Sequence, residues 1–146
     1  MDGRQPLGCA QSLQGTFLAL CIFLAEDNPI IRANLTETVR EFVGEDVVGY
    51  ATSEVEALTW LISRSEEWDL AILDLFLQRG NGLSVLSGCR VRRPSQKVVV
   101  LSNYATPDMR RRCIGLGADA VFDKSTELHA LLDYCIELKQ RTTGRT

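Results

Sequence analysis

The chain has 146 residues, of which 45% are apolar and 24% are charged. This length suits one domain with a buried core, and the composition is that of a globular protein. The formal net charge of −3 argues against a general nucleic-acid binder, because phosphate binding requires a basic face. The basic run Arg110-Arg111-Arg112 has consecutive positions that splay around a helix, which favours a solvated face over a phosphate patch.

The five cysteines are odd in number, widely spaced and without a CxxC pair, and the chain has one histidine. This pattern argues against a disulfide framework and a zinc site, and it favours buried free thiols in a reducing cytosol. The apolar segment 17–25 could pass for a short signal-peptide core. It ends at Glu26-Asp27-Asn28-Pro29 rather than at a small-residue cleavage site, and it is too short to span a membrane. We therefore expect a buried first strand and a cytoplasmic protein.

In chain order, residues 1–16 have no periodicity and are expected to form a loose N-terminal extension. From residue 17, apolar runs alternate with amphipathic helices. The expected strands are 18–25, 47–50, 70–73, 98–101 and 120–122. The expected helices are 29–43, 54–65, 83–91, one from 107 to about 115 or 117, and a last one capped by Ser125 or Thr126. The domain is expected to cover 17–140, with a tail at 141–146.

Two helix starts carry a clear signal. Asn28 is a plausible N-cap followed by Pro29, and Thr106 is followed by Pro107 in the same way. Five βα units whose strands are apolar throughout predict a parallel sheet covered on both faces. The predicted fold class is α/β, a flavodoxin-like (βα)5 doubly wound sheet with strand order 2-1-3-4-5.

Polar residues stand just past four of these strands. Glu26 and Asp27 follow the first strand, Asp74 the third, Ser102 the fourth and Lys124 the fifth. In such sheets, ligands bind outside the carboxyl ends of the strands where the strand order reverses, which is between the first and third strands. The fold should therefore bring these side chains to one edge.

Three clustered acids repel one another unless they share protons or hold a cation. Oxygen ligands without a nearby His or Cys suit Mg²⁺, with Mn²⁺ as an alternative. Lys124 would add a point charge and Ser102 a small donor. Such a set suits a carboxylate that accepts a phosphoryl group.

Five short motifs are similar to those of the response-regulator receiver domain of two-component signalling. They are Ala25-Glu26-Asp27-Asn28, Ile72-Leu73-Asp74-Leu75, Gly82 eight residues past Asp74, Leu101-Ser102 and Asp123-Lys124. The resemblance covers about residues 17–140. It implies that Asp74 is the phosphoacceptor, that Glu26, Asp27 and Asp74 hold Mg²⁺ with the backbone carbonyl of Phe76, that Ser102 is the switch hydroxyl, and that Lys124 contacts the phosphoryl group.

The chain departs from the family pattern at three positions. Gln78 and Ser125 stand where proline is usual, so a cis bond before residue 125 is not expected. Val121 stands where the switch aromatic is usual, and Phe122 should point to the other side of the strand. Tyr104 or Phe122 could take the switch role. Phe76 and Tyr104 could cover an acyl phosphate or serve only as loop anchors.

The resemblance implies a single-domain signalling protein that takes a phosphoryl group from a phosphohistidine of a sensor histidine kinase or a histidine phosphotransfer protein. The surface that changes should be 106–115 and 125–139. We expect no direct contact with nucleic acid or a membrane, and no enzymatic activity beyond phosphoryl transfer and dephosphorylation at its own Asp74. The sequence does not decide whether the protein forms a homodimer, or whether the chain is a receiver domain cut from a larger protein.

Two other functions compete with this one. An aspartate-nucleophile phosphatase carries a second acid two residues past the nucleophile, where this chain has Phe76, which has no proton to give. A pseudo-receiver that binds partners without phosphorylation is disfavoured by the intact acidic set.

Overall fold

Five parallel strands form one sheet in the computed structural model, which describes residues 19–143. The strands are β1 (Ile22–Ala25), β2 (Val47–Ala51), β3 (Leu70–Leu73), β4 (Lys97–Ser102) and β5 (Ala120–Asp123), and the helices are α2 (Pro29–Val43), α3 (Glu54–Ser63), α4 (Gly82–Gly88), α5 (Pro107–Gly115) and α6 (Leu128–Thr143). The strand order β2-β1-β3-β4-β5 confirms the predicted flavodoxin-like topology.

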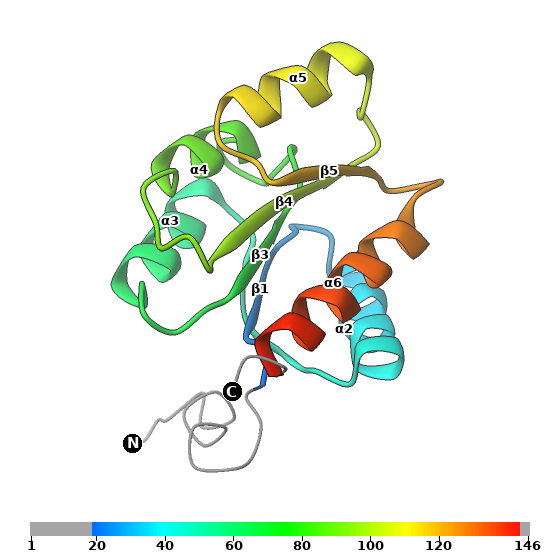
Figure 1. Cartoon of the computed structure of the whole chain (residues 1–146). Coiled ribbons are helices and arrows are strands. Elements are labelled where there is room, and N and C mark those ends of the chain that lie inside the picture. The colour runs from blue at the N-terminus through cyan, green and yellow to red at the C-terminus, as the bar shows by residue number, and fades with distance from the viewer. Residues whose placement is uncertain (1–18, 144–146) are drawn as a thin grey trace.

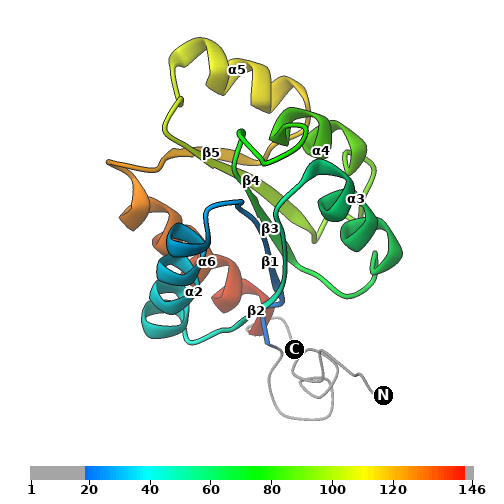
Figure 2. The same cartoon turned by 180° about the vertical axis from the view of Figure 1, so that it is seen from behind.

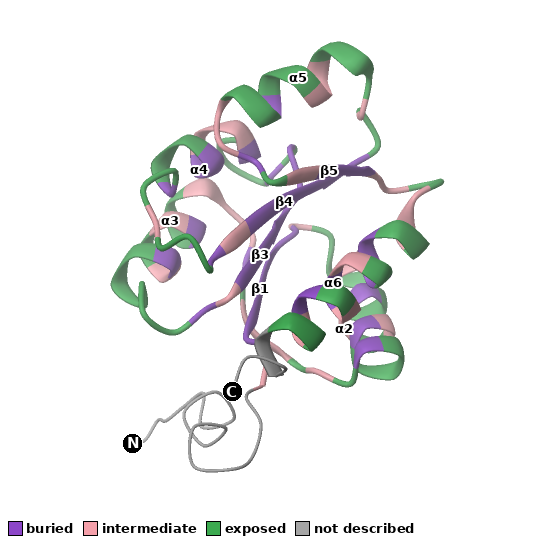
Figure 3. Cartoon of the chain, in the orientation of Figure 1, coloured by how far each residue is buried: buried purple, intermediate pink, exposed green. Residues whose placement is uncertain are grey.

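Helices cover both faces of the sheet (Figure 1 and, from behind, Figure 2). Because successive strand residues point to opposite faces, each strand contributes to two cores. Phe23 and Ala25 of β1 pack into the core under α3, α4 and α5, whereas Ile22 and Leu24 pack into the core under α2 and α6. The central strands are buried along their whole length, as Figure 3 shows, which accounts for their apolar sequence.

The expected helix starts are confirmed at two sites. The Asn28 side chain accepts hydrogen bonds from the backbone N–H groups of Ile30 and Ile31, and the Thr106 hydroxyl accepts one from Met109. Gly44 ends α2 with a φ of 78°, a left-handed conformation that glycine adopts without strain.

Several element boundaries differ from those expected. β1 begins at Ile22, α4 ends at Gly88, and α6 continues to Thr143, past the expected domain boundary at 140. The expected extension at 1–16 lies outside the described residues. Ser125 and Thr126 do not cap α6 with their side chains. Both donate their backbone N–H groups to the Asp123 carboxylate instead, which forms a turn. The helix therefore begins only at Leu128.

Arg92 ties together the amino-terminal ends of β4 and β5. Its guanidinium donates to the carbonyl oxygens of Gln96, Cys89 and Gly117 at 3.0, 3.1 and 2.8 Å and to the Asp119 carboxylate at 2.8 Å. The same carboxylate oxygen accepts the backbone N–H of Val98 at 2.8 Å. This end of the sheet, opposite the predicted site, is therefore held by a charged network.

Cys89, Cys113 and Cys135 are buried free thiols, as expected. Burial raises the pKa of each of these thiols, in the case of Cys135 to about 12. Cys21 is disulfide-bonded, so the expectation of a free thiol is wrong at that residue. Across residues 19–143, no helix has both the length and the apolar character that crossing a bilayer requires.

Candidate functional site

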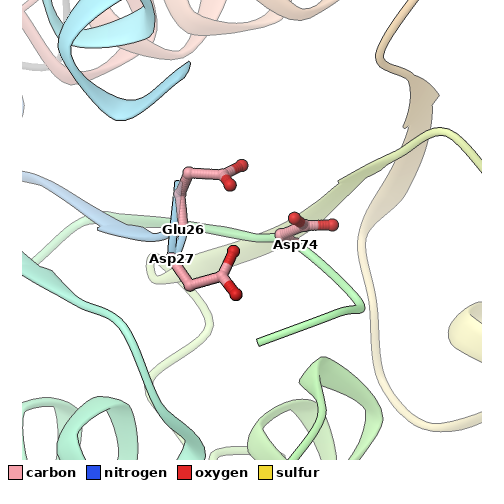
Figure 4. Close-up of side chains that lie close together, drawn as sticks. All are labelled: Glu26, Asp27 and Asp74. Atoms are coloured by element: carbon pink, nitrogen blue, oxygen red, sulfur yellow. The ribbon is translucent and has the colours of Figure 1, made fainter. Parts of the chain in front are cut away.

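The three predicted acids converge at the carboxyl ends of the two central strands. Glu26 and Asp27 follow β1 and Asp74 follows β3, and these strands pair directly, with Ala25 opposite Leu73. One carboxylate oxygen from each acid lies within 4.8 Å of the others (Figure 4). The structure thus brings together the acids that the sequence pattern indicated.

Lys124 lies between two of these acids. Its Nζ is 2.8 Å from Glu26 Oε1 and 3.1 Å from Asp74 Oδ2. Glu26 is 2% exposed and Asp74 is 8% exposed, so each carboxylate would be costly without a partner. The ammonium group pairs with two of the three clustered carboxylates, and the cluster therefore retains an excess of negative charge.

The pKa values of this cluster reflect burial and charge together. Burial is the main cause that raises the pKa of Asp74, the Lys124 ammonium opposes it, and the Glu26 charge adds to it. At Lys124, burial acts to lower the pKa, but the hydrogen bond to Glu26 and the charges of Asp74 and Glu26 outweigh it and raise the pKa. The lysine therefore stays protonated at neutral pH.

The acidic cluster fits a hard divalent cation. Its ligand atoms are oxygens from Glu26, Asp27 and Asp74, and its negative charge exceeds that of its ammonium partner. Glu26 and Asp74 are oriented by Lys124, and Asp27 is the most exposed of the three acids. A metal role for the Phe76 carbonyl stays a prediction from the family resemblance.

The loop after Asp74 packs tightly against the backbone of Asp74 and Leu75. Gly82 donates its N–H to the Leu75 carbonyl at 2.9 Å, and Phe76 forms an antiparallel bridge with Asn81. A Cβ atom at residue 82 would lie 2.2 Å from the Asp74 carbonyl oxygen. This close approach explains why a glycine stands eight residues past Asp74.

Both departures from proline have a structural reason. The N–H of Gln78 donates to the Thr52 carbonyl at 3.0 Å, and the N–H of Ser125 donates to the Asp123 carboxylate at 2.8 Å. Proline has no N–H and could make neither bond. Every peptide bond in the part of the chain that the structure describes is trans, which agrees with the expectation before residue 125.

Ser102 ends β4 beside the lysine. It is fully buried, its hydroxyl oxygen accepts the N–H of Tyr104 at 3.0 Å, and its carbonyl accepts the N–H of Lys124 at 2.9 Å. The hydroxyl proton is not used in the bond to Tyr104, so it can be donated to a third group.

Phe76 and Tyr104 come from different loops and touch each other. Their rings lie edge to face with centroids 4.9 Å apart, and the two residues are 56% and 59% exposed. Both rings are too exposed to anchor a core, so the contact links the loop after Asp74 to the loop after Ser102. The sequence indicated each residue singly but not their contact.

Val121 and Phe122 face opposite sides of β5, as expected. Val121 lies in the core under α3, α4 and α5. Phe122 lies in the core under α2 and α6 and contacts the Tyr134 ring edge to face at 5.8 Å. Phe122 is therefore separated by the sheet from the core that Val121 enters.

Arg110 is a residue that the sequence interpretation missed. Arg111 and Arg112 are exposed, as expected of a solvated face. The Arg110 side chain instead turns toward β5 and donates to the Val121 carbonyl at 3.0 Å and the Glu127 carboxylate at 2.8 Å. Both partners are distant in sequence, and no local signal marks them.

A family model described as the response regulator receiver domain matches residues 22–135. The chain belongs to the receiver domain family. The curated relatives of this receiver domain include the response regulator protein PmrA of Pseudomonas aeruginosa, which is 32% identical over 126 residues, 85% of this chain and 54% of the relative. The DNA-binding transcriptional activator DevR/DosR of Mycobacterium tuberculosis is 29% identical over 97 residues, 66% of this chain and 44% of the relative.

Solved receiver structures share the fold. The receiver domain of Francisella response regulator 1452 has a TM-score of 0.72 and 22% identity, and the match covers 85% of this chain and 99% of that one. The BeF3-activated DrrB receiver domain has a TM-score of 0.68 and 18% identity, and the match covers 83% and 97% of the two chains. The chain spans about half the length of the curated relatives it matches.

Proposed function

We propose that this receiver domain accepts a phosphoryl group on Asp74 from a phosphohistidine and then changes a partner-binding surface. The observation that supports this most directly is the Lys124 ammonium at 3.1 Å from Asp74 and 2.8 Å from Glu26, within the cluster of three carboxylates. A carboxylate held this way has an adjacent positive charge to stabilise a second anionic group brought to it.

In the proposed step, an Asp74 carboxylate oxygen forms a bond to phosphorus as the phosphorus–nitrogen bond to the donor histidine breaks. The imidazole nitrogen keeps the electron pair of that bond and takes up a proton. Lys124 would neutralise a phosphoryl oxygen, and the Ser102 hydroxyl, whose proton is unused, would donate to another. Mg²⁺, or Mn²⁺ in its place, held by Glu26, Asp27, Asp74 and the Phe76 carbonyl, would supply further neutralisation of the phosphoryl charge.

The donor would be a sensor histidine kinase or a histidine phosphotransfer protein. The surface expected to change is formed by α5, β5 and α6, because β5 leads into Lys124 and both helices flank it. The protein would catalyse phosphoryl transfer and hydrolysis only at its own Asp74, without turnover of a separate substrate.

The experiment is incubation with acetyl phosphate and Mg²⁺, followed by intact mass measurement. We expect a gain of one phosphoryl group that is absent in Asp74→Asn. Asp133→Asn is the matched control, because it makes the same change at an exposed carboxylate of α6. No mass gain in the wild type, or an equal gain in Asp74→Asn, would contradict the proposal.

A phosphatase is the competing function. Phe76, two residues past Asp74, offers no acid to protonate a leaving group. We therefore expect no steady release of phosphate from a simple phosphomonoester. Sustained turnover of such a substrate would favour the phosphatase function instead.

A further inference from the structure

The Arg110 side chain connects three segments around the predicted site. Its Nε donates to the Ala105 carbonyl at 2.9 Å, one terminal nitrogen donates to the Val121 carbonyl at 3.0 Å, and the other donates to Glu127 Oε1 at 2.8 Å. Arg110 itself belongs to α5. One guanidinium thus joins the loop after β4, the strand β5 and the turn before α6.

The last two contacts bracket Lys124. Val121 lies three residues before the lysine and Glu127 three residues after it. Glu127 Oε1 also accepts the N–H of Asp123 at 2.8 Å, directly before the lysine. A chain of hydrogen bonds therefore runs from Arg110 through Glu127 to the residue beside Lys124.

The geometry of the contact matters more than its charge. The Arg110 and Glu127 side chains are 36% and 38% exposed, and an ion pair at this exposure adds little to stability. The planar guanidinium presents its N–H groups in fixed directions, so three acceptors in three segments are held in one arrangement. A lysine ammonium at the same place could not reproduce this fork.

We propose that Arg110 is a positioning residue for phosphoryl transfer: it fixes the 121–127 turn that carries Lys124, and through that turn it couples the lysine to α5. Val121 has no aromatic ring that could link β5 to α5, and the guanidinium bond to its carbonyl makes that link instead. When Lys124 turns from Glu26 to a phosphoryl oxygen, the turn moves and Arg110 passes the movement to α5. This inference rests on the proposed function of Asp74.

The first test measures the rate of labelling by acetyl phosphate in Arg110→Ala and Arg110→Lys. Because misplacing a catalytic group lowers reaction rates steeply, we expect both variants to label about tenfold more slowly than the wild type. Arg112→Ala is the matched control, since Arg112 is an exposed arginine of the same helix, and we expect its rate to be unchanged within about twofold.

A second readout distinguishes positioning from general loss of structure. Amide hydrogen exchange of α5 is measured with and without beryllium fluoride and Mg²⁺. We expect exchange in α5 to change in the wild type and in Arg112→Ala, but not in Arg110→Ala. Glu127→Ala, which removes the acceptor of the Arg110 and Asp123 N–H groups, should reproduce the slow labelling. The double variant should be no slower than Arg110→Ala, because both changes break the same connection.

The possible outcomes are distinct. If the wild type is not labelled at Asp74, the proposed function fails and the inference fails with it. If the wild type is labelled, and Arg110→Ala has the same rate and the same α5 response, only the inference is overturned. If circular dichroism shows that Arg110→Ala does not fold, Glu127→Ala is the deciding variant, and wild-type labelling and wild-type α5 exchange in that variant would overturn the inference.

Discussion

The rings of Phe76 and Tyr104 meet edge to face at 4.9 Å, although the two residues are 28 positions apart in the chain. They follow Asp74 and Ser102 by two residues each and remain more than half exposed. The contact therefore joins two aromatic rings from the loops that follow Asp74 and Ser102.

Neither ring offers a carboxylate or an amide that could orient a water molecule toward an acyl phosphate. We therefore predict slow self-dephosphorylation and a shorter phosphoryl lifetime in Phe76→Asn. A positioned base contributes roughly 10²–10⁴-fold, and a neutral amide should shorten the lifetime by a smaller factor, about tenfold. The decay is followed by intact mass after removal of acetyl phosphate. Phe42→Asn replaces an exposed phenylalanine of α2 and is the control; an unchanged lifetime in Phe76→Asn would refute the prediction.

Asp27 is predicted to be necessary for the metal-dependent step. It is the most exposed acid of the cluster, and its carboxylate contributes to the oxygen set within 4.8 Å. We expect Asp27→Ala to abolish Mg²⁺-dependent labelling, because a hard cation loses a charged ligand. Labelling is measured over a series of Mg²⁺ concentrations, with Asp133→Ala as the control. Undiminished labelling would remove Asp27 from the site.

The raised pKa of Asp74 predicts a stability change with pH. The pKa of Asp74 is higher in the folded protein than in the unfolded chain, where an aspartate has a pKa near 3.8. Between these two pKa values the folded state binds more protons, so the contribution of Asp74 to stability falls as pH rises through that window. At pH 7 without metal, Asp74→Asn should therefore unfold at a higher temperature than the wild type.

The difference in unfolding temperature between Asp74→Asn and the wild type should shrink as the pH falls toward and below the ordinary aspartate pKa. There, Asp74 is protonated in both the folded and the unfolded state. Thermal unfolding with a chelator present, at several pH values, measures this. Added Mg²⁺ should raise the unfolding temperature of the wild type more than that of Asp74→Asn. An Asp74→Asn protein that is less stable than the wild type at pH 7 would contradict the expected sign of this effect.

Gly82 is predicted to be intolerant of a side chain. A Cβ there would lie 2.2 Å from the Asp74 carbonyl oxygen and 2.9 Å from Leu75 Cα, both backbone atoms that cannot swing away. We expect Gly82→Ala to cost about 1–3 kcal/mol of unfolding free energy. At Gly115, nothing lies within 4 Å of an added Cβ, and Gly115→Ala should change stability by less than about 1 kcal/mol. Urea unfolding compares the two, and equal stabilities would count against the steric argument.

The strand-end residues were predictable because the signals that place them are local. Asp74 and Lys124 each follow a buried apolar run, and the general rule for parallel sheets brings the ends of adjacent strands together. Ser102 and the acidic pair follow from the same reasoning. For these residues, sequence order and one topological rule contain the necessary information.

Contacts between side chains of different loops were not predictable in this way. The acceptors of Arg110 lie 5, 11 and 17 residues away, and which arginine of the basic run faces β5 depends on how α5 sits on the sheet. The sequence pattern places the start of α6 too early, because the Asp123 carboxylate binds the next N–H groups and forms a turn. The first error comes from contacts between distant segments, and the second comes from a local turn at Asp123 that replaces the expected helix cap.

The network around Arg92 has a practical consequence for spectroscopy. It fixes the loops that enter β4 and β5, at the end of the sheet remote from the acids. Val91, next to this network, is 97% exposed, so a fluorophore attached there would have room and would follow the tumbling of the whole domain. Such a label provides an internal reference. The motion of a second dye on α5 could be compared with it to detect a change in α5.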